Sequence, residues 1–493
     1  MTPAPEAGVS SSFCHSPMSF ISSISQPLHR SRLVSGIVAV AFFMQMLDST
    51  IITTSLPAMA SAFSTDVVSL NIGFTAYLLA MAVFIPPAGW LADRFGARSV
   101  FLSAIALFTI SSVACGVVSS LGEFTAARLV QGTSAALMTP VGRQLVLRNA
   151  PKAELVHAIA TITWPALIAP VLGPLIGAWI TTNIGWQWNF FINVPLGLAG
   201  VLLVAAFVPR EPAERARPFD FKGFFLTSGA LASILAGLEL SSSPNGSGVA
   251  AALVIAGGML AVFAVRHLNR NRAGLLDLSV LKIPTFALAT LSSGTAGRLA
   301  INATPFLLPL LFQVGLGFSA VETGTLVLAY FLGNLLMKSV TTPLLRRFGF
   351  RRLLVVNGII ASASLAAFAA VGHETPRILL LALLLAAGLS RSMQFTSLNT
   401  ISFADVTTDQ RSAATTISAM LQQLSQLLGV AVAAAVIRFS AGARNLAEGE
   451  HAGLADIRVA FVVIAVIGLV SALRFLALPS DAGAEVSGHR ALG

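Results

Sequence analysis

Residues 91–101 read LADRFGARSVF, and residues 344–354 read LLRRFGFRRLL. Aligned without gaps, the two segments share an Arg-Phe-Gly core and a second arginine two residues beyond the glycine. A glycine in such a turn allows backbone conformations that other residues rarely adopt. The repeated basic turn indicates a duplicated unit, and a chance match of two short motifs is the alternative. The matched pairs are Arg94 with Arg347, Phe95 with Phe348, Gly96 with Gly349, and Arg98 with Arg351.

Both turns lie between long apolar segments. The chain has 493 residues, of which 55% are hydrophobic and only 10% charged, and its mean hydropathy is +0.83. Soluble domains carry about 25% charged residues, and a helix needs about 20 mostly apolar residues to cross a bilayer. These figures predict an all-α integral membrane protein with fourteen spans. The spans are expected near residues 33–57, 70–91, 99–119, 123–146, 157–181, 189–208, 222–240, 249–266, 284–313, 321–344, 352–371, 377–402, 412–437 and 457–478.

Lysine and arginine concentrate in the loops after the even-numbered spans, and the other loops carry few of them apart from Arg377 and the long last loop. The loop after the fourth span, for example, carries Arg143, Arg148 and Lys152. Positively charged loops stay on the cytoplasmic side. We therefore expect a multi-pass protein of the cell's inner (cytoplasmic) membrane with both termini in the cytoplasm.

The two related turns follow the second and the tenth spans. Two six-helix halves with a two-helix insert between them explain this separation, and such repeats are typical of secondary transporters. Residues 1–32 are rich in serine and proline, a composition that predicts disorder. The predicted organisation is a disordered cytoplasmic tail at 1–32, an N-terminal half at 33–208, an insert with cytoplasmic linkers at 209–283, a C-terminal half at 284–478 and a cytoplasmic tail at 479–493.

The first span contains an aspartate, in FFMQMLDSTIITTSLP (42–57). A carboxylate at the centre of a membrane helix costs about 2.5–3.5 kcal/mol on insertion scales, so Asp48 is a functional candidate. The fourth span, RLVQGTSAALMTP (128–140), places Arg128 several residues inside an apolar helix. Asp48 is the only acidic residue well inside the N-terminal half, so we expect it to pair with Arg128. Snorkelling of Arg128 to the outer interface is the alternative.

The first of the two turns contains an acidic residue in addition to the arginines that determine membrane orientation. In GWLADRFGAR (89–98), an aspartate lies where the second span emerges and can pair with arginines or with a neighbouring helix end. Such a cluster could lock one conformation and release it when the halves move, whereas a plain solvated turn is the alternative. The residues assigned to this conformational switch are Gly89, Asp93, Arg94, Gly96 and Arg98.

The fifth span, WPALIAPVLGPLIGAW (164–179), has three prolines, which lack the amide proton of a helical hydrogen bond. We expect Pro165, Pro170 and Pro174 to bend the helix. Gly173 and Gly177 form a small-xxx-small face that allows close helix contact. A bent, closely packed helix beside a cavity could act as a gate, although glycine and proline are also common in ordinary membrane helices.

These motifs together resemble the major facilitator superfamily, and specifically its fourteen-span drug:proton antiporter branch of multidrug exporters. The resemblance rests on LDSTIITTSLP (47–57), GWLADRFGAR, RLVQG, APVLGPLIGAW, WQWNFFINVPLG (186–197) and, in the insert, FDFKGFFL (219–226). It implies export of small molecules by alternating access, driven by the proton gradient, with Asp48 as proton carrier and Arg128 biasing its ionisation. The sequence departs from the antiporter signature at Ala169 and Ala178, where glycines are usual, so we expect looser helix contact there. A further departure is Gln187, where the branch often has arginine.

Cations outnumber carboxylates within the spans, where Arg128, Arg298, Lys338 and Arg391 face only Asp48. If these cations line one central cavity, its potential is positive, which favours an anionic or zwitterionic substrate such as an organic acid or a metal-chelate anion. Snorkelling of some cations is the alternative. The residues predicted to line the substrate cavity are Gln45, Gln131, Arg298, Asn302, Asn334, Lys338, Arg391 and Gln394.

Other classes of protein fit less well. No nucleophile–base pair, metal-ligand spacing or phosphate loop stands out, so an enzyme is not predicted, and Cys14 and Cys115 suggest neither a disulfide framework nor a metal site. A membrane sensor that does not transport stays open. We expect a monomer in the lipid bilayer that binds protons and a small-molecule substrate, uses the proton gradient instead of a cofactor, and binds no nucleic acid.

Overall fold

A computed structural model of the chain describes residues 27–52, 55–65, 70–210, 218–240, 247–271, 274–444 and 453–489. These residues form helices and their connections, without a strand. Most of the expected N-terminal tail, residues 1–26, lies outside the described part. The first helix, α2 (Pro27–Ile51), begins earlier than the hydropathy of the sequence predicts, so the end of the expected tail is helical.

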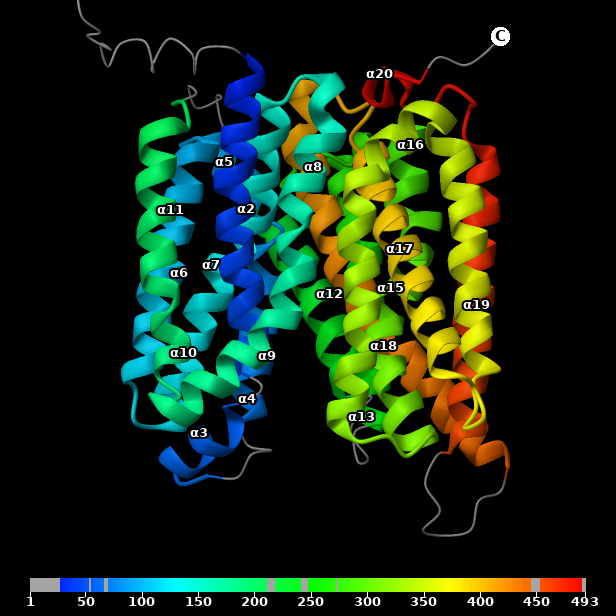
Figure 1. The fold of residues 1–493 in the computed structure, drawn as a ribbon. Helices are drawn as coiled ribbons and strands as arrows, with labels where there is room; N and C mark the ends of the chain where they lie inside the picture. The colour runs from blue at the N-terminus through cyan, green and yellow to red at the C-terminus, as the bar shows by residue number, and fades with distance from the viewer. Residues whose placement is uncertain are drawn as a thin grey trace, which may run out of the picture.

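The N-terminal half is built from α2 and nine further helices (Figure 1). The second predicted span is a pair of helices bent by 58° at the intervening residues, and the fifth and sixth spans are also each made of two consecutive helices. The helices after α2 are α3 (Leu56–Ala62), α4 (Asn71–Phe84), α5 (Ala88–Phe95), α6 (Ala97–Val117), α7 (Leu121–Asn149), α8 (Leu155–Thr163), α9 (Pro165–Asn183), α10 (Trp188–Phe191) and α11 (Asn193–Phe207).

The insert and the C-terminal half follow in the same order as predicted. Two spans are merged in α16, where only Gly349 departs from helical geometry (φ +70°). Gly96, its counterpart in the first half, has φ +84°, so both turns adopt the conformation that favours glycine. The helices are α12 (Phe221–Leu240), α13 (Ser247–Arg270), α14 (Pro284–Phe286), α15 (Ser293–Pro309), α16 (Ala320–Ala369), α17 (Arg377–Ile401), α18 (Arg411–Ala443), α19 (Leu454–Arg474) and α20 (Ala484–Ser487).

Every predicted span coincides with one or more of these helices. Within the described residues, nine helical segments are long and apolar enough to cross a membrane, or ten if the bent pair α4 and α5 is one span. The other predicted spans correspond to α7, to α8 with α9, to α14 with α15, and to the second arm of α16. The arrangement is consistent with fourteen crossings.

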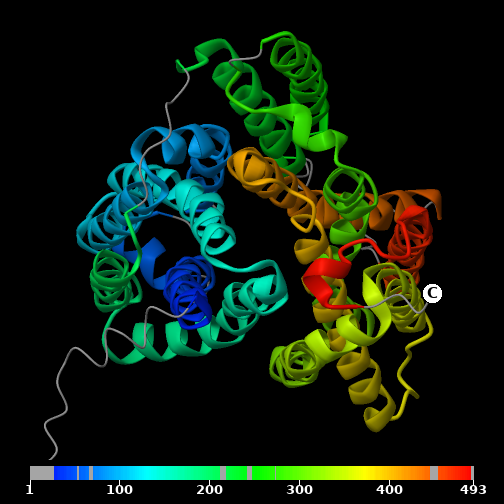
Figure 2. The same cartoon turned by 90° about the horizontal axis from the view of Figure 1, so that it is seen from above.

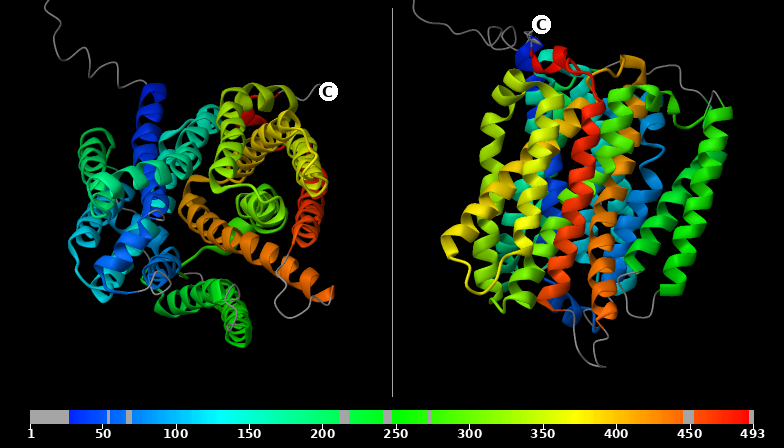
Figure 3. Two further views of the ribbon diagram at one scale, coloured as in Figure 1. Left: turned by 60° about the horizontal axis from the view of Figure 1, so that its bottom comes forward. Right: turned by 90° about the vertical axis from the view of Figure 1, so that its right-hand side faces the viewer.

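The helices gather into two bundles with the insert beside them. Seen from above, the N-terminal half and the C-terminal half lie next to each other, and α12 and α13 (green) lie together outside both (Figure 2). The side views agree with this placement (Figure 3). The insert contacts both halves, because α12 packs against α4 and α18.

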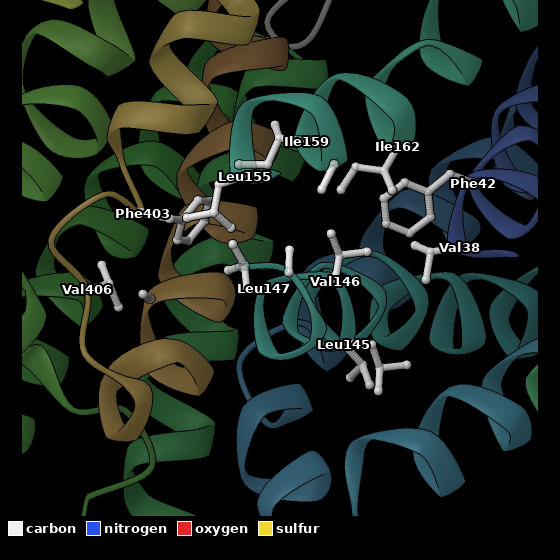
Figure 4. Packing of buried hydrophobic residues seen from close by; sticks show 14 of the residues in the cluster. Val38, Phe42, Leu145, Val146, Leu147, Leu155, Ile159, Ile162, Phe403 and Val406 are labelled. Atoms are coloured by element: carbon white, nitrogen blue, oxygen red, sulfur yellow. The ribbon is translucent and has the colours of Figure 1, made fainter. Parts of the chain in front are cut away.

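One hydrophobic cluster joins the two halves at the end of the molecule that carries the described chain ends. It contains side chains of α2, α7 and α8 together with Phe403 and Val406 from the connection after α17 (Figure 4). Burial of such side chains from water or headgroups is favourable by roughly 25 cal/mol per Å² of apolar surface. This end of the molecule is therefore closed by apolar packing.

The insert is fixed to its flanking connections by Asp220 of the FDFKGFFL motif. Its carboxylate lies 2.9 Å from His267 Nε2 and accepts hydrogen bonds from the backbone amides of Gly223 (2.9 Å) and Leu275 (3.1 Å). Burial alone would raise the pKa of Asp220, but these hydrogen bonds together hold it below its ordinary value. The motif thus orients α12 and α13.

Helix contact in the first bundle depends on a glycine of α7. A Cβ atom at Gly132 would lie 2.3 Å from the Tyr77 carbonyl oxygen on α4, whereas a Cβ at Gly122 of the same helix meets nothing. We predict that Gly132→Ala lowers the free energy of unfolding by about 1–3 kcal/mol through overpacking. Gly122→Ala is the matched control and should be neutral or slightly stabilising. Equal unfolding midpoints for the two variants in detergent would contradict this close contact.

Candidate functional site

Asp48 lies in the interior of the N-terminal bundle with its side chain fully buried. Its Oδ2 accepts a hydrogen bond from Arg128 Nη1 at 2.8 Å, so the predicted pair is confirmed as a contact. Its Oδ1 accepts from Gln131 Nε2 (2.9 Å) and from Asn193 Nδ2 (2.8 Å). The carboxylate therefore has one cation and two amide donors around it, which compensates much of the cost of burying its charge.

A second layer of polar groups orients these donors. The Ser112 hydroxyl oxygen on α6 accepts hydrogen bonds from Gln131 (2.7 Å) and from Asn193 (2.9 Å). Gln131 Oε1 accepts from Arg128 Nη1 at 2.5 Å. The result is a closed network that draws on α2, α6, α7 and α11. Each helix supplies one or two polar side chains to an otherwise apolar core.

Arg128 does not snorkel, because only 1% of its side chain is exposed. Its guanidinium carbon lies 4.4 Å from the centre of the Tyr77 ring and 5.7 Å from that of Phe74, distances that allow cation–π attraction. Its Nε has no hydrogen-bond partner. The arginine is therefore held by aromatic faces on one side and by Asp48 and Gln131 on the other.

Two asparagines of this region were not singled out from the sequence. Asn193 binds Asp48 directly, and Asn189 donates to Ser55 (2.6 Å), to Thr181 (2.8 Å) and to the Gly177 carbonyl (3.3 Å). Both lie in WNFFINVPLG, where two amides recur at a spacing of one helical turn in an apolar run. That spacing was the available signal, since buried amides need partners.

The predicted switch residues occupy the end where the two halves meet. Asp93 accepts from Gln144 Nε2 (3.3 Å) and lies 3.5 Å from Arg148 Nη2, so it pairs with the end of α7, a neighbouring helix. Arg98 donates to the Val204 (3.4 Å) and Ala205 (2.5 Å) carbonyls at the end of α11, whereas Arg94 is exposed. The charge cluster thus ties the turn to two helix ends.

Gly89 contributes to the contact between halves. A Cβ there would lie 2.7 Å from the Thr416 hydroxyl and 2.8 Å from that of Ser412, both on α18. The small residue therefore lets α5 and α18 approach closely. The same interface contains Arg143, which donates to Ser418 (3.3 Å) and Gln422 (3.1 Å). Assigning Arg143 to a loop was wrong, because α7 extends to Asn149 and buries it.

The antiporter helix packs tightly on the first span. A Cβ at Gly173 would lie 2.2 Å from Thr50 Oγ1, and that hydroxyl donates to the Ala169 carbonyl at 3.1 Å. Ala169 is fully buried, so the expectation of looser contact was wrong at that position, whereas Ala178 is exposed. The helix breaks at Trp164, directly before Pro165, and α9 continues through positions 170 and 174. The side chains of Pro170 and Pro174 lie outside the described part.

Among the described residues, the four membrane cations are not brought together around one cavity, contrary to the expectation, since Arg128 and Arg298 are fully buried at separate contacts. Arg298 donates to the Ala289 carbonyl (2.8 Å) and to Asn399 (3.0 Å), which secures the broken start of its own span. Lys338 donates to Thr396 at 2.6 Å. Arg391 instead lines a small cavity inside the C-terminal bundle. Hydropathy identifies such residues but does not indicate the direction in which each side chain points.

The remaining predicted cavity residues divide in the same way. Gln131 belongs to the Asp48 network. Gln45 of α2 accepts a hydrogen bond from Thr139 of α7 (3.2 Å). Gln394 lines the small cavity but is already bonded to Asn357 (2.9 Å). Asn302 is half-buried, and Asn334 is fully buried with neither amide atom paired. The described residues contain no group of three potential metal ligands.

Comparisons with known proteins identify the family of the chain. The family model of the Major Facilitator Superfamily matches residues 38–301 and 286–491. Proteins named "Putative multidrug resistance protein MdtD" from Salmonella heidelberg (strain SL476) and Salmonella newport (strain SL254) are 33% identical over 446 residues, which cover 90% of this chain and 94% of theirs.

Solved structures with the same fold are more distant in sequence. The human organic anion transporter MFSD10 (TETRAN) is 16% identical with a TM-score of 0.63, and the match covers 90% of this chain and 99% of that one. The proton:xylose symporter XylE, bound to 6-bromo-6-deoxy-D-glucose, is 16% identical with a TM-score of 0.60, covering 93% and 98%. At these identities the likeness concerns the fold.

The buried pair makes a prediction about stability. Asp48→Asn leaves the Arg128 cation without its carboxylate, so we expect a loss of about 3–5 kcal/mol of unfolding free energy. The double variant Asp48→Asn/Arg128→Gln removes both charges and should lose less than Asp48→Asn alone. Equilibrium unfolding in mixed micelles measures both. A double variant that is less stable than Asp48→Asn would show that the charges are not coupled.

Proposed function

Because the chain belongs to the major facilitator superfamily and is therefore a membrane transporter, we propose that it exports small molecules in exchange for protons. The relatives named for multidrug resistance support a broad range of substrates. We further propose an inner-membrane location with both termini in the cytoplasm, from the distribution of basic loops. The transporter would work as a monomer with the proton gradient as its energy source.

The observation that carries the proposal is the network around Asp48. A carboxylate such as that of Asp48 can accept a proton, whereas a guanidinium is not deprotonated in proteins. Protonation would weaken the contact at 2.8 Å, but Arg128 would keep its bond to Gln131 Oε1. The network can thus release the carboxyl group while the guanidinium keeps a hydrogen-bond acceptor, although it loses its counter-charge. This is the requirement for a carboxylate that gains and loses a proton within a membrane.

The contacts between the halves suggest how the proton site is exposed alternately. The polar contacts between the halves include the bonds from Arg143 to α18 and the ion pair of Lys152 with Glu485. They lie, with the cluster of Figure 4, at the end that carries the basic loops. On the proposed orientation the structure is closed to the cytoplasm, and separation of these contacts would open it.

The energy available fits such a pump. One proton moving down a potential of 100 mV provides about 2.3 kcal/mol. A tenfold concentration ratio of a neutral substrate corresponds to about 1.4 kcal/mol. One-for-one exchange could therefore concentrate a neutral substrate modestly outside the cell.

We predict that Asp48→Asn abolishes proton coupling. Addition of ethidium or 1-naphthoate to purified wild-type protein should release protons, which a pH dye detects in weakly buffered solution. The folded fraction of the Asp48→Asn variant should release none, because its amide cannot titrate. Glu239→Gln is the matched control, since Glu239 is a carboxylate at a helix end that bonds Thr75 (2.7 Å), and it should behave like wild type.

Retention of proton release by the Asp48→Asn variant would remove Asp48 from the mechanism. Reconstituted vesicles with an imposed pH gradient address the sensor alternative. A transporter dissipates the gradient when substrate is added, and a sensor leaves it unchanged. A gradient that persists with both probes would contradict export.

The contact at Gly89 gives a second prediction about transport. Gly89→Leu would insert a side chain into the closed interface with α18 and favour separation of the halves at that end, so we expect transport to slow by about tenfold or more. Gly36→Leu on α2 is the control, because a Cβ there meets nothing within 4 Å. Vesicle efflux rates measure both variants. Equal rates would show that this contact does not take part in the transport cycle.

A further inference from the structure

The C-terminal bundle contains a cavity of about 40 Å³, lined by apolar groups and by several polar ones, that the proposed coupling mechanism does not use. Ligand sites for whole drug-sized molecules measure about 300–1,000 Å³, so this space suits one functional group. Its polar lining consists of Arg391 and Gln394 on α17, Tyr330 and Ser362 on α16, Thr304 on α15 and Ser471 on α19. None of its lining residues is acidic.

The cavity corresponds by internal symmetry to the Asp48 site. Tyr330 follows Tyr77 by the same interval along the chain that separates Arg347 from Arg94. A Cβ at Gly132 would lie 2.3 Å from the Tyr77 carbonyl oxygen, and one at Gly388 would lie 1.9 Å from that of Tyr330. The two tyrosines therefore hold equivalent places in the two bundles.

A second pair of glycines shows which residues of the C-terminal bundle lie at the position that corresponds to Asp48. Gly173 of α9 packs against Thr50 and Ile51 of α2, just beyond Asp48. Gly429 of α18 packs in the same way against α15, around Leu299 and Ala303. The residues of α15 at the level of Asp48 are thus Ala300 and Ile301, and both line the cavity. The cavity exists where the first half has its carboxylate.

Arg391 has no carboxylate partner among the described residues. The Arg391 guanidinium carbon lies 5.5 Å from the centre of the Tyr330 ring. Arg391 follows Gly388 by three residues, whereas Arg128 precedes Gly132 by four, so the two arginines approach their tyrosines from different turns of the helix. No ion pair involves Arg391 among the described residues. Lys338 is near enough to interact electrostatically with Arg391, which makes the local potential more positive. A negatively charged group would be stabilised here.

A second donor also faces the cavity. Tyr330 is 1% exposed, and its hydroxyl makes no hydrogen bond of ordinary geometry with any described residue, although Thr304 and Arg391 are polar neighbours of it. Thr304 and Ser471 donate their protons to backbone carbonyls (3.1 and 2.7 Å). Within the described residues, the donors left for a ligand are therefore the guanidinium of Arg391 and the hydroxyls of Tyr330 and Ser362.

We propose that this cavity binds the carboxylate, or a similar small oxyanion, of the exported substrate. The anionic group of the substrate lies in the C-terminal bundle at the level that Asp48 occupies in the N-terminal bundle, where Arg391 and Tyr330 line the cavity. The statement that the bound anion is the transported substrate rests on the proposed export function. The statement that the cavity binds an anion does not. The substrates preferred by this chain are accordingly organic anions.

Equilibrium binding of radiolabelled 1-naphthoate to the purified full-length protein, without a gradient, tests the site. The neutral 1-naphthamide has nearly the same shape and is the reference ligand. Wild type should prefer the carboxylate by about tenfold or more, as charge-assisted hydrogen bonds predict. Arg391→Gln should remove the preference, and Arg391→Lys should keep part of it.

Two further variants separate a binding role from a structural one. Tyr330→Phe removes an oxygen atom that makes no hydrogen bond, so the unfolding midpoint should not fall while naphthoate affinity drops severalfold. Lys338→Gln removes a nearby charge that does not line the cavity and should reduce the preference much less than Arg391→Gln. Equal affinities for the two ligands in wild type, or a preference that survives Arg391→Gln, would overturn the proposal.

Asp48→Asn distinguishes this proposal from the proposed function. If that variant still prefers naphthoate but releases no protons, both proposals stand. Proton release that survives in Asp48→Asn contradicts the coupling role and leaves the anion site supported by its own binding data. Counterflow of naphthoate in vesicles then identifies the bound anion as cargo, and a bound but untransported anion would overturn that assignment.

Discussion

A charge pair buried in apolar surroundings is the constraint that organises the first bundle. Asp48 and Arg128 are 0% and 1% exposed, and neither charge could be buried alone without a large cost. Their pairing at 2.8 Å still leaves lone pairs and protons to satisfy, which explains why Gln131, Ser112 and Asn193 converge on the same point. Helices α2, α6, α7 and α11 must therefore keep a fixed register, because a shift of one residue would leave a polar group unpaired.

Close packing at glycines makes that convergence possible. Gly132 lets α7 approach the backbone of α4, and Gly173 lets α9 approach α2, so that the helices behind the pair exclude lipid and water. Gly388 and Gly429 make the corresponding contacts in the second bundle. The duplicated feature is thus the packing of helices, whereas the polar chemistry inside the two bundles has diverged. A helix framework of this kind accepts different interior groups provided that the glycine contacts remain.

The sequence was sufficient for the features that depend on composition and spacing. It predicted the helical spans, the paired glycine turns and the contact of Asp48 with Arg128, since a lone carboxylate and a lone cation in one apolar half have few other partners.

The sequence-based prediction failed where the direction of a side chain determines its contacts. Arg143 was assigned to a loop because hydropathy does not show where a helix ends when polar residues lie on one of its faces. Arg298 and Lys338 were assigned to a shared cavity, yet each is bonded to its own surroundings. Asn193 was overlooked because its role appears only when α11 is placed beside α2.

The difference between the bundles has a consequence for coupling. In the first bundle the arginine is neutralised by the protein itself, and only a proton can change the charge there. In the second bundle the arginine lies over its tyrosine beside a cavity that contains no acid, so the charge there can be compensated only by something that enters. A proton and an anion would then act on equivalent points of two similar bundles that share one closed interface. Each bundle would favour a different charge state at its centre, and the interface between them, with Gly89 and Arg143, is where the two events would have to be communicated.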